Sequence, residues 1–290
     1  MRVLRTTGEK WFDAINYVLL TLIILICVIP YLNIVAKSFS GEAHVMAGDV
    51  FLIPMDFNLK AYEVVFGSRI FLDALKVSVF VTVTGTVLNV TLTILAGYAL
   101  SRQRLAGQKV FMFLFVFTML FSGGMIPSYL VVKETGLLNS LWALIIPGLV
   151  SPFQMIIMRL YFYTIPNSLE ESAKMDGASH TRILISIMIP LAMPAIATIA
   201  LFYAVEYWNS YFDALMYINR RERFPLQVYL RDTLINASDA NLENMDLMMN
   251  VAQESVRGAT VVAATLPILL VYPFLQKHFV KGVMLGAVKE

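Results

Sequence analysis

The chain has 290 residues, of which 58% are hydrophobic and 14% are charged, and its formal net charge is +2. Soluble domains carry about 25% charged residues, so this composition excludes a disordered chain, a collagen and a coiled coil, and it indicates a protein whose main solvent is lipid. The small net charge gives no strong basic field for nucleic acid, and the single cysteine (Cys27) and three distant histidines (His44, His180, His278) indicate neither a disulfide nor a metal cluster.

Six stretches lack Asp, Glu, Lys and Arg altogether, and each is between 19 and 25 residues long. A helix needs about 20 apolar residues to cross a bilayer. Only helices and closed barrels satisfy their backbone hydrogen bonds in lipid, and the two-residue alternation of a barrel strand is missing from these stretches. We therefore predict an all-α polytopic membrane protein with six transmembrane helices at residues 14–36, 77–101, 110–132, 135–158, 183–205 and 258–276.

Residues 1–13 form the predicted N-terminal segment, and the first apolar helix follows at 14–36. The apolar stretch is longer than that of a signal peptide, and no small-residue cleavage pattern precedes Lys37, so we interpret it as a retained span. An external loop at 37–76 leads to the second predicted helix, and the remainder of the chain, 77–290, forms the predicted core.

The link between the second and third helices fixes the predicted orientation. It contains Arg102, Arg104 and Lys109 and no acidic residue. A short, purely basic loop is typical of the cytoplasmic side of a membrane. By parity, both termini and the link between the fourth and fifth helices are also predicted to be cytoplasmic.

Polar and helix-breaking residues interrupt the apolar helices. Ser122, Gly123, Gly124 and Pro127 are predicted to loosen or break the third helix, either to line a water-filled path or as a kink used only for packing. Asn89 in the second helix and Gln154 in the fourth are polar residues in apolar surroundings. Hydrogen bonding between helices explains the two polar residues as well as solute contact does.

The segment between the fourth and fifth helices predicts a short cytoplasmic helix at about 168–176. Pro166 stops the preceding helix, and Ser168 with Glu171 has the spacing of a capping box. Gly177 suits a left-handed helix end, and Ser179 or Thr181 can cap the helix that follows. An ordinary amphipathic surface helix is the alternative interpretation.

The spacing around this short helix resembles the loop signature of permease subunits of ATP-binding-cassette importers. That signature is Glu-Ala-Ala, three residues, Gly, nine residues, Ile, one residue, Leu-Pro. Here Glu171, Ala173 and Gly177 are followed by Ile187, Ile189 and Pro190, with departures at Ser172 and Ile189.

Further motifs are similar to the carbohydrate group of these permeases, and the C-terminal motif is similar to a subgroup for oligosaccharide and polysaccharide-fragment uptake. They are Tyr-Ala-Leu-Ser-Arg at 98–102, Gly-Leu-Leu-Asn at 136–139, Asp-Gly-Ala at 176–178, Trp-Asn-Ser at 208–210, and Tyr-Pro-Phe-Leu-Gln-Lys at 272–277 with Lys-Gly at 281–282. The resemblance implies a type I importer permease fold in a bacterial-type cell membrane, with the chain forming half of the translocation path. It also implies a second permease, favoured to be a different chain, an ATPase dimer and an extracytoplasmic solute-binding protein.

By the same resemblance, the short helix is the coupling helix that sits in a cleft of the ATPase. The implied coupling residues are Glu170, Glu171, Ala173, Lys174, Asp176, Gly177 and Ala178.

The end of the fifth helix and the external loop 206–257 offer candidate solute contacts. Aromatic faces beside amide and carboxylate groups suit sugars, which present both C–H faces and hydroxyls. The candidate path residues are Asn89, Gln154, Glu206, Tyr207, Trp208, Asn209 and Phe212. An interfacial aromatic belt is the alternative, and a methionine-rich stretch at 245–249 is either a docking surface or packing.

The sequence contains no Gly-x-x-x-x-Gly-Lys-Ser/Thr phosphate loop and no hydrolase or zinc-protease motif. We therefore expect a transport subunit and not an enzyme, with no cofactor of its own and with ATP and Mg²⁺ on a partner ATPase. The charge-free helices argue against a secondary transporter. The alternatives kept open are the same type of importer for a non-sugar solute, and an ion-coupled carrier or channel.

Overall fold

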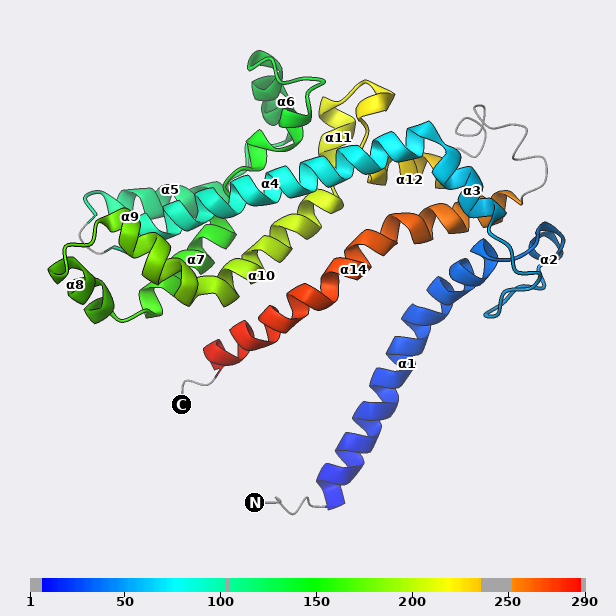
Figure 1. Ribbon diagram of the computed structural model, residues 1–290, viewed down its shortest axis with the longest axis horizontal. Coiled ribbons are helices and arrows are strands. Elements are labelled where there is room, and N and C mark those ends of the chain that lie inside the picture. Colours follow the sequence, from blue (N-terminus) through cyan, green and yellow to red (C-terminus); the bar gives the residue numbers. More distant parts are fainter. Residues whose placement is uncertain (1–6, 103–104, 236–251, 288–290) are drawn as a thin grey trace. The chain divides into compact units, whose positions relative to one another are not determined.

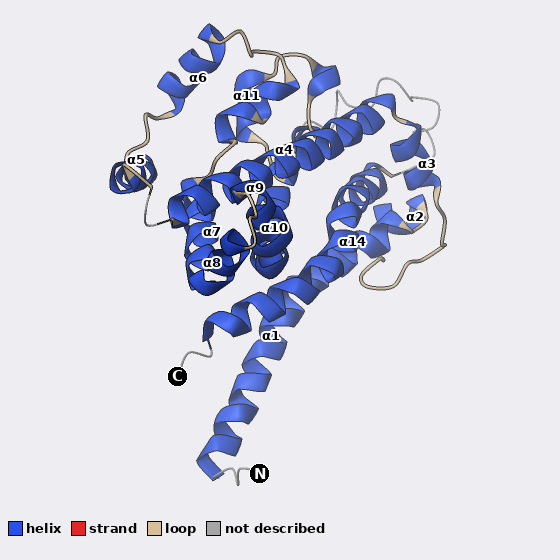
Figure 2. Ribbon diagram, turned by 60° about the vertical axis from the view of Figure 1, so that its left-hand side comes forward, coloured by secondary structure: helices blue, strands red, loops and turns tan. Residues whose placement is uncertain are grey.

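The computed structural model describes residues 7–102, 105–235 and 252–287, and within these ranges it contains helices and no strand (Figure 2). The chain divides into two compact units. The first comprises residues 1–69 and 230–265, and the second comprises 70–229 and 266–290.

The first unit is built on α1 (Thr7–Ser38) and the beginning of α14 (Gln253–Ala287), with the short helices α2 (Glu42–Ala47) and α3 (Lys60–Gly67). Gly258 lets α14 approach α1 closely, since a Cβ at this position would lie 2.9 Å from the carbonyl oxygen of Ile34. The Tyr31 and Thr265 hydroxyls are 2.9 Å apart, and Lys37 pairs with Glu254 at 3.0 Å. No residue in the most apolar window of α1 is buried, as expected of side chains that face lipid.

The second unit packs α4 (Arg69–Ser101) against α7 (Pro152–Thr164) and α10 (Ile189–Trp208) (Figure 1). Two glycines of α4 allow this approach. A Cβ at Gly97 would lie 3.0 Å from the Met158 side chain, and a Cβ at Gly85 would lie 2.5 Å from the Tyr207 ring. The core of this unit is apolar, and its fully buried side chains include Ile145, Met155, Met158, Ile183, Met188, Ile199 and Tyr203.

The predicted break in the third span is confirmed. Residues 110–132 are divided between α5 (Gln108–Leu120) and α6 (Met125–Glu134), whose axes differ by 117°. Gly124, at the start of α6, has a φ of +86°, a conformation that a side chain disfavours.

The prediction of a continuous helix at 135–158 is wrong. Gly136 and Asn139 both have positive φ, two short 3₁₀ turns follow at Leu141–Leu144 and Ile146–Gly148, and α7 begins only at Pro152. The axis of the segment Leu141–Gly148 and the axis of α7 differ in direction by 49°. The left-handed residues end the preceding helix, and Pro147 and Pro152 lack the amide hydrogen that a continuous helix would need.

The fifth predicted span lies within a continuous stretch of α9 (His180–Ile183), a wide π-helical turn η3 (Leu184–Met188) and α10. Pro190 explains the wide turn, because its ring would clash with the carbonyl of Ser186 in a regular α-helix. Ser179, one of the two candidates named from the sequence, caps α9 by accepting a hydrogen bond from the Arg182 amide at 3.3 Å.

The described residues contain three helices long and apolar enough to cross a membrane, or up to five if each bent pair counts as one span. The sixth apolar window, 258–276, lies within α14. The six-span count and the cytoplasmic placement of the termini stay predictions. Within residues 206–257 the structure has α11 (Phe212–Tyr217), the turn η4 (Arg221–Arg223) and α12 (Leu226–Ile235), while the methionine-rich stretch 245–249 lies outside the described residues.

Candidate functional site

The short polar helix predicted between the fourth and fifth spans is present as α8 (Asn167–Met175). The predicted capping box is wrong. Pro166 occupies the N-cap position and Ser168 lies inside the helix, with no side chain capping the first turn. Proline supplies a carbonyl, which accepts from the Leu169 amide at 3.3 Å, and its fixed φ suits a helix entrance.

The end of α8 is closed by a pair of backbone hydrogen bonds around Gly177. The Gly177 amide donates to the Lys174 carbonyl at 3.0 Å, and the Ala178 amide donates to the Ala173 carbonyl at 2.9 Å. This is the Schellman arrangement, which requires a left-handed residue at its centre. Gly177 has a φ of +78°, so the predicted left-handed helix end is confirmed and fixes how the chain leaves α8.

The residues predicted to couple to an ATPase divide between two faces of α8. Glu170 and Ala173 are buried against the rest of the second unit, whereas Glu171, Lys174, Asp176 and Gly177 are exposed and Ala178 is half-buried. Two apolar side chains also face outward, Leu169 and Met175, and Met175 is 89% exposed. The outer face of α8 therefore combines charges with two exposed apolar side chains.

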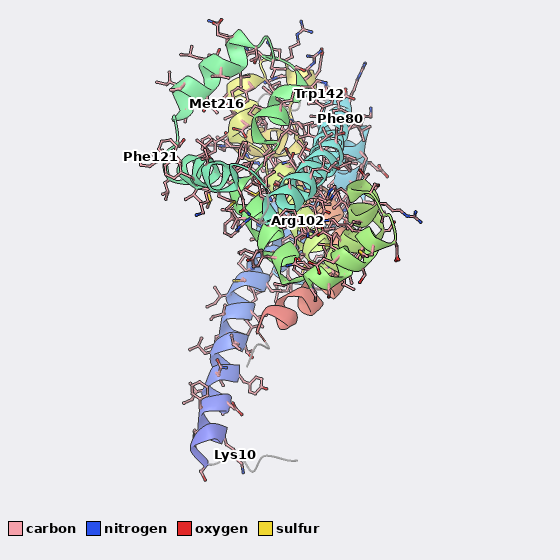
Figure 3. All side chains as sticks on the ribbon, turned by 90° about the vertical axis from the view of Figure 1, so that its left-hand side faces the viewer. Lys10, Phe80, Arg102, Phe121, Trp142 and Met216 are labelled. Carbon is pink, nitrogen blue, oxygen red and sulfur yellow. The ribbon has the colours of Figure 1, made fainter. Side chains whose placement is uncertain are left out.

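The inner face of α8 carries an ion pair that the sequence analysis missed. The Glu170 carboxylate pairs with Arg102, which directly follows α4, and accepts from Lys174 at 2.8 Å. The Arg102 guanidinium carbon lies 4.4 Å from the centre of the Tyr98 ring, and Figure 3 shows where Arg102 lies in the molecule. Arg102 and Glu170 are distant in the sequence, so no local spacing signalled their pairing.

The polar candidates for a solute path include a buried cluster at the crossing of α4 and α10. Asn89, which is 1% exposed, donates to the Gly148 carbonyl at 2.8 Å and accepts from the Tyr207 hydroxyl at 3.1 Å. Gln154 accepts a hydrogen bond from Ser151. Since Asn89 and Tyr207 bind each other across helices, the geometry favours the helix-packing interpretation for Asn89. The bond of Gln154 is local, because Ser151 is the N-cap residue of the same helix α7.

The other candidate path residues differ in exposure. Trp208 is buried, whereas Glu206, Asn209 and Phe212 are exposed at the end of α10 and the start of α11. Asn209 donates to the Val205 carbonyl at 2.8 Å. The structure thus places Asn89 and Tyr207 in one hydrogen-bonded cluster. Of the candidate path residues, Glu206, Asn209 and Phe212 have exposed side chains.

A second polar centre, also missed from the sequence, surrounds Asn139. Its amide donates to the Tyr217 carbonyl at 2.8 Å, its side-chain oxygen accepts from the Asn219 amide at 2.6 Å, and its carbonyl accepts from Arg223. The φ of Asn139 is +59°, a left-handed value that asparagine tolerates better than most residues. Asn139 therefore links the turn after α6 to the end of α11 and the segment that follows it. The helices α6 and α11 are themselves in contact.

Replacing Asn139 by leucine is expected to lower the free energy of unfolding by about 1–3 kcal/mol, because the backbone strain and the lost acceptor add. Asn139→Gly is the matched control, since it keeps the left-handed backbone and removes only the side-chain acceptor. Thermal unfolding in detergent measures both. Equal stability of Asn139→Leu and the parent chain would contradict this role.

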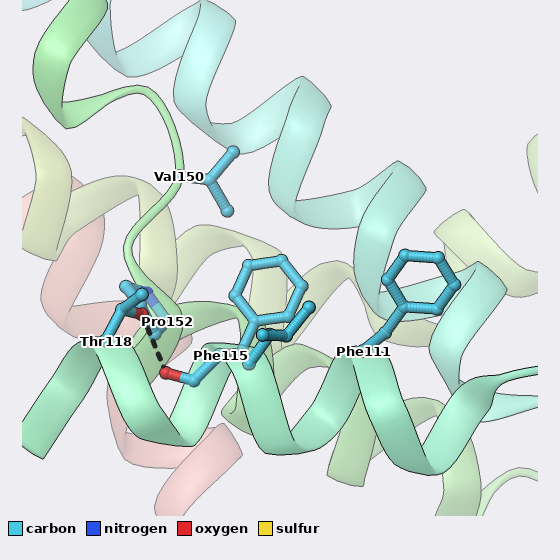
Figure 4. A pocket seen from close by; sticks show the side chains of 6 residues that line it. Phe111, Phe115, Thr118, Val150 and Pro152 are labelled. Carbon is cyan, nitrogen blue, oxygen red and sulfur yellow. Dashed lines mark hydrogen bonds between the residues drawn. The ribbon is translucent and has the colours of Figure 1, made fainter.

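A groove of about 500 Å³ lies beside α5, and its lining is Phe111, Leu114, Phe115, Thr118, Val150 and Pro152 (Figure 4). The one hydroxyl among these residues, that of Thr118, donates to the Phe115 carbonyl at 2.8 Å. The groove therefore offers an apolar surface. Across residues 7–102, 105–235 and 252–287, no group of three or more His, Cys, Asp or Glu side chains is placed to hold a metal ion.

The family model "Binding-protein-dependent transport system inner membrane component" matches residues 89–285. The chain is 48% identical to the polygalacturonan/rhamnogalacturonan transport system permease protein YtcP of Bacillus subtilis, covering 97% of this chain and 99% of that protein. It is 45% identical to protein LplC of the same organism, covering 98% and 97%.

Solved structures include chains that are similar over nearly the whole length. A chain of a bacterial ABC transporter involved in the import of the acidic polysaccharide alginate is 38% identical, with a TM-score of 0.90 over 95% of this chain and 99% of that chain.

Proposed function

Because this chain belongs to the family of binding-protein-dependent transport system inner membrane components, we propose that it is the membrane-spanning permease subunit of an ATP-driven oligosaccharide importer. The observation that carries the proposal is full-length similarity, at 48% identity, to a permease named for polygalacturonan and rhamnogalacturonan transport. The chain is a transport subunit and not an enzyme, and it is an inner-membrane component of a bacterial transporter.

The outer face of α8 is the proposed contact with an ATPase. The sequence has no phosphate loop of its own, so the energy of ATP hydrolysis arrives through a partner that binds ATP and Mg²⁺. The exposed Glu171, Lys174 and Met175 supply charges and an apolar contact, and the closed end at Gly177 makes α8 rigid. Closure of the ATPase would then shift the permease between its inward-facing and outward-facing states.

The proposed assembly contains two further proteins. A second permease subunit, of a different sequence, completes the translocation path of which this chain forms half. An extracytoplasmic solute-binding protein delivers the solute to the external segment 206–257, in which Glu206, Asn209 and Phe212 are exposed. In this arrangement α8 and both termini are cytoplasmic.

We further propose that the solute is a fragment of an acidic polysaccharide. Two relatives support this class of solute, since one is named for polygalacturonan and the other belongs to a transporter of the acidic polysaccharide alginate.

Solute-stimulated ATP hydrolysis by the assembled transporter in lipid nanodiscs tests both proposals. Oligogalacturonates presented by the binding protein are expected to stimulate hydrolysis at least about tenfold more than maltooligosaccharides, a difference of about 1.4 kcal/mol. Stimulation by an amino acid and by no sugar would establish an importer for a non-sugar solute. Solute flux through this chain alone, without an ATPase, would contradict the proposal and favour a carrier or channel.

A further inference from the structure

The inner face of α8 meets the second unit through one charged side chain and one alanine. Only Glu170 and Ala173 of the nine residues of α8 are buried, so little apolar area holds this helix in place. The Glu170 carboxylate is 6% exposed and is shared by Arg102 and Lys174. Because Lys174 belongs to α8 itself, Arg102 is the partner that joins Glu170 to another element.

Arg102 is held at the end of α4 by its surroundings. The guanidinium lies over the Tyr98 ring, one turn earlier on the same helix. Burial lowers the pKa of Arg102 from its ordinary value, because desolvation disfavours the charged form, yet an arginine in a protein stays protonated. A charge in this position needs an anionic partner, and Glu170 supplies it.

The end of α4 is itself fixed to neighbouring helices. The Leu100 carbonyl accepts from the Gln108 side chain of α5 at 2.6 Å and from the Arg159 guanidinium of α7 at 2.8 Å. The last carbonyls of a helix have no partner within the helix, and here the partners come from two other helices. Arg102 therefore connects α8 to a point where α4, α5 and α7 are already joined.

We propose that Arg102 is a positioning residue that binds α8 rigidly to the end of α4, so that a displacement of α8 is carried into α4. This inference rests on the proposed function, because it takes α8 to be the element that an ATPase moves. Because of this ion pair, the two neighbouring carboxylates of α8, Glu170 and Glu171, have different roles. Glu170 faces the permease and transmits the movement, while the exposed Glu171 faces the partner.

The direct test measures the distance between α8 and α4 during the ATPase cycle. Spin labels are placed at Asn167→Cys on α8 and Leu95→Cys on α4, both exposed positions, with Cys27→Ser as background. Double electron–electron resonance is recorded on the assembled transporter, nucleotide-free and trapped with ATP and vanadate. We expect one distance in both states for the parent chain, and a broadened distribution that shifts between states for Glu170→Gln.

The stimulation of ATP hydrolysis by binding protein loaded with oligogalacturonate is measured on the Glu170 and Arg102 variants. Glu170→Gln and Arg102→Gln are expected to lower the stimulation of ATP hydrolysis about tenfold, within the usual range of coupling between sites. The exchange variant, Arg102→Glu with Glu170→Arg, is expected to recover most of the stimulation and the single distance. Glu63→Gln, at an exposed carboxylate of α3, is the matched control and should change neither readout.

The possible outcomes separate this inference from the proposed function. If the parent transporter is stimulated and Glu170→Gln is equally stimulated with an unchanged distance, the rigid connection is wrong and the proposed function stands. If the parent distance itself changes between the two trapped states, α8 and α4 move independently and the inference is also wrong. If no ATPase assembles with the parent chain, the proposed function fails, and the inference fails with it.

Discussion

Replacing Gly177 by leucine is expected to leave the protein inserted in the membrane and to abolish solute-stimulated ATP hydrolysis. Gly177 has a φ of +78°, and a side chain in this left-handed conformation costs roughly 1–2 kcal/mol. The chain would relieve the strain by opening the hydrogen bonds from Gly177 to Lys174 and from Ala178 to Ala173. The end of α8 would then lose the fixed geometry that an ATPase needs to move it.

The matched control is Gly177→Asn, because asparagine tolerates the left-handed conformation and should retain much of the stimulation. A second variant, Glu171→Lys, inverts the charge on the outer face of α8 without altering the helix end, and it should also lose stimulation. Full stimulation in both Gly177→Leu and Glu171→Lys, measured on the reconstituted transporter, would refute the coupling role of α8.

Replacing Gly85 by valine is expected to have the largest effect on folding. A Cβ at Gly85 would lie 2.5 Å from the Tyr207 ring, closer than side-chain atoms can approach. Such overpacking costs about 1–3 kcal/mol or more. Displacing Tyr207 would also break its hydrogen bond to Asn89, which measures 3.1 Å. We expect a lower unfolding temperature in detergent and a broadened size-exclusion peak.

Two further variants identify the cause of this destabilisation. Gly67→Ala, at the end of α3, has open space around the added Cβ and should leave the unfolding temperature nearly unchanged. Combining Gly85→Val with Tyr207→Ala removes the ring from the contact and should recover part of the loss relative to Tyr207→Ala alone. No difference between Gly85→Val and the parent chain would show that α4 and α10 do not pack at this point.

The long helices could be located from the sequence because each contains a long apolar run without charged residues. Charge-free stretches marked α1, α4 and α10, although α1 begins at Thr7 and α4 at Arg69, before their apolar runs. The same criterion failed at 135–158, where the residues are apolar but the backbone is not continuous. Left-handed Gly136 and Asn139, with Pro147 beyond them, break that helix, and hydropathy carries no information about backbone angles.

In the candidate site, too, features that depend on neighbouring residues could be predicted from the sequence, whereas a contact between residues far apart in the chain could not. Gly177 could be predicted, because a left-handed helix end depends on the residues next to it. The start of α8 was misplaced by a local signal of the same kind, since Ser168 and Glu171 fit a capping box while Pro166 took the N-cap position. The pairing of Glu170 with Arg102 joins two elements far apart in the chain, and only the folded arrangement of α4, α7 and α8 brings them together.

The wide turn at Leu184–Met188 has a consequence for how this chain can evolve. A π-helical turn accommodates one residue more than a regular turn, so losing one residue there can restore a regular helix without changing which side of α10 faces the core. Losing one residue within α10 instead would rotate everything beyond it by about 100°, and the buried Ile199 and Tyr203 would leave the core. Single-residue deletions should therefore be tolerated at this turn and selected against further along α10. A regular helix there would meet the clash of Pro190 with the carbonyl of Ser186, so the shorter chains should carry another residue in place of the proline.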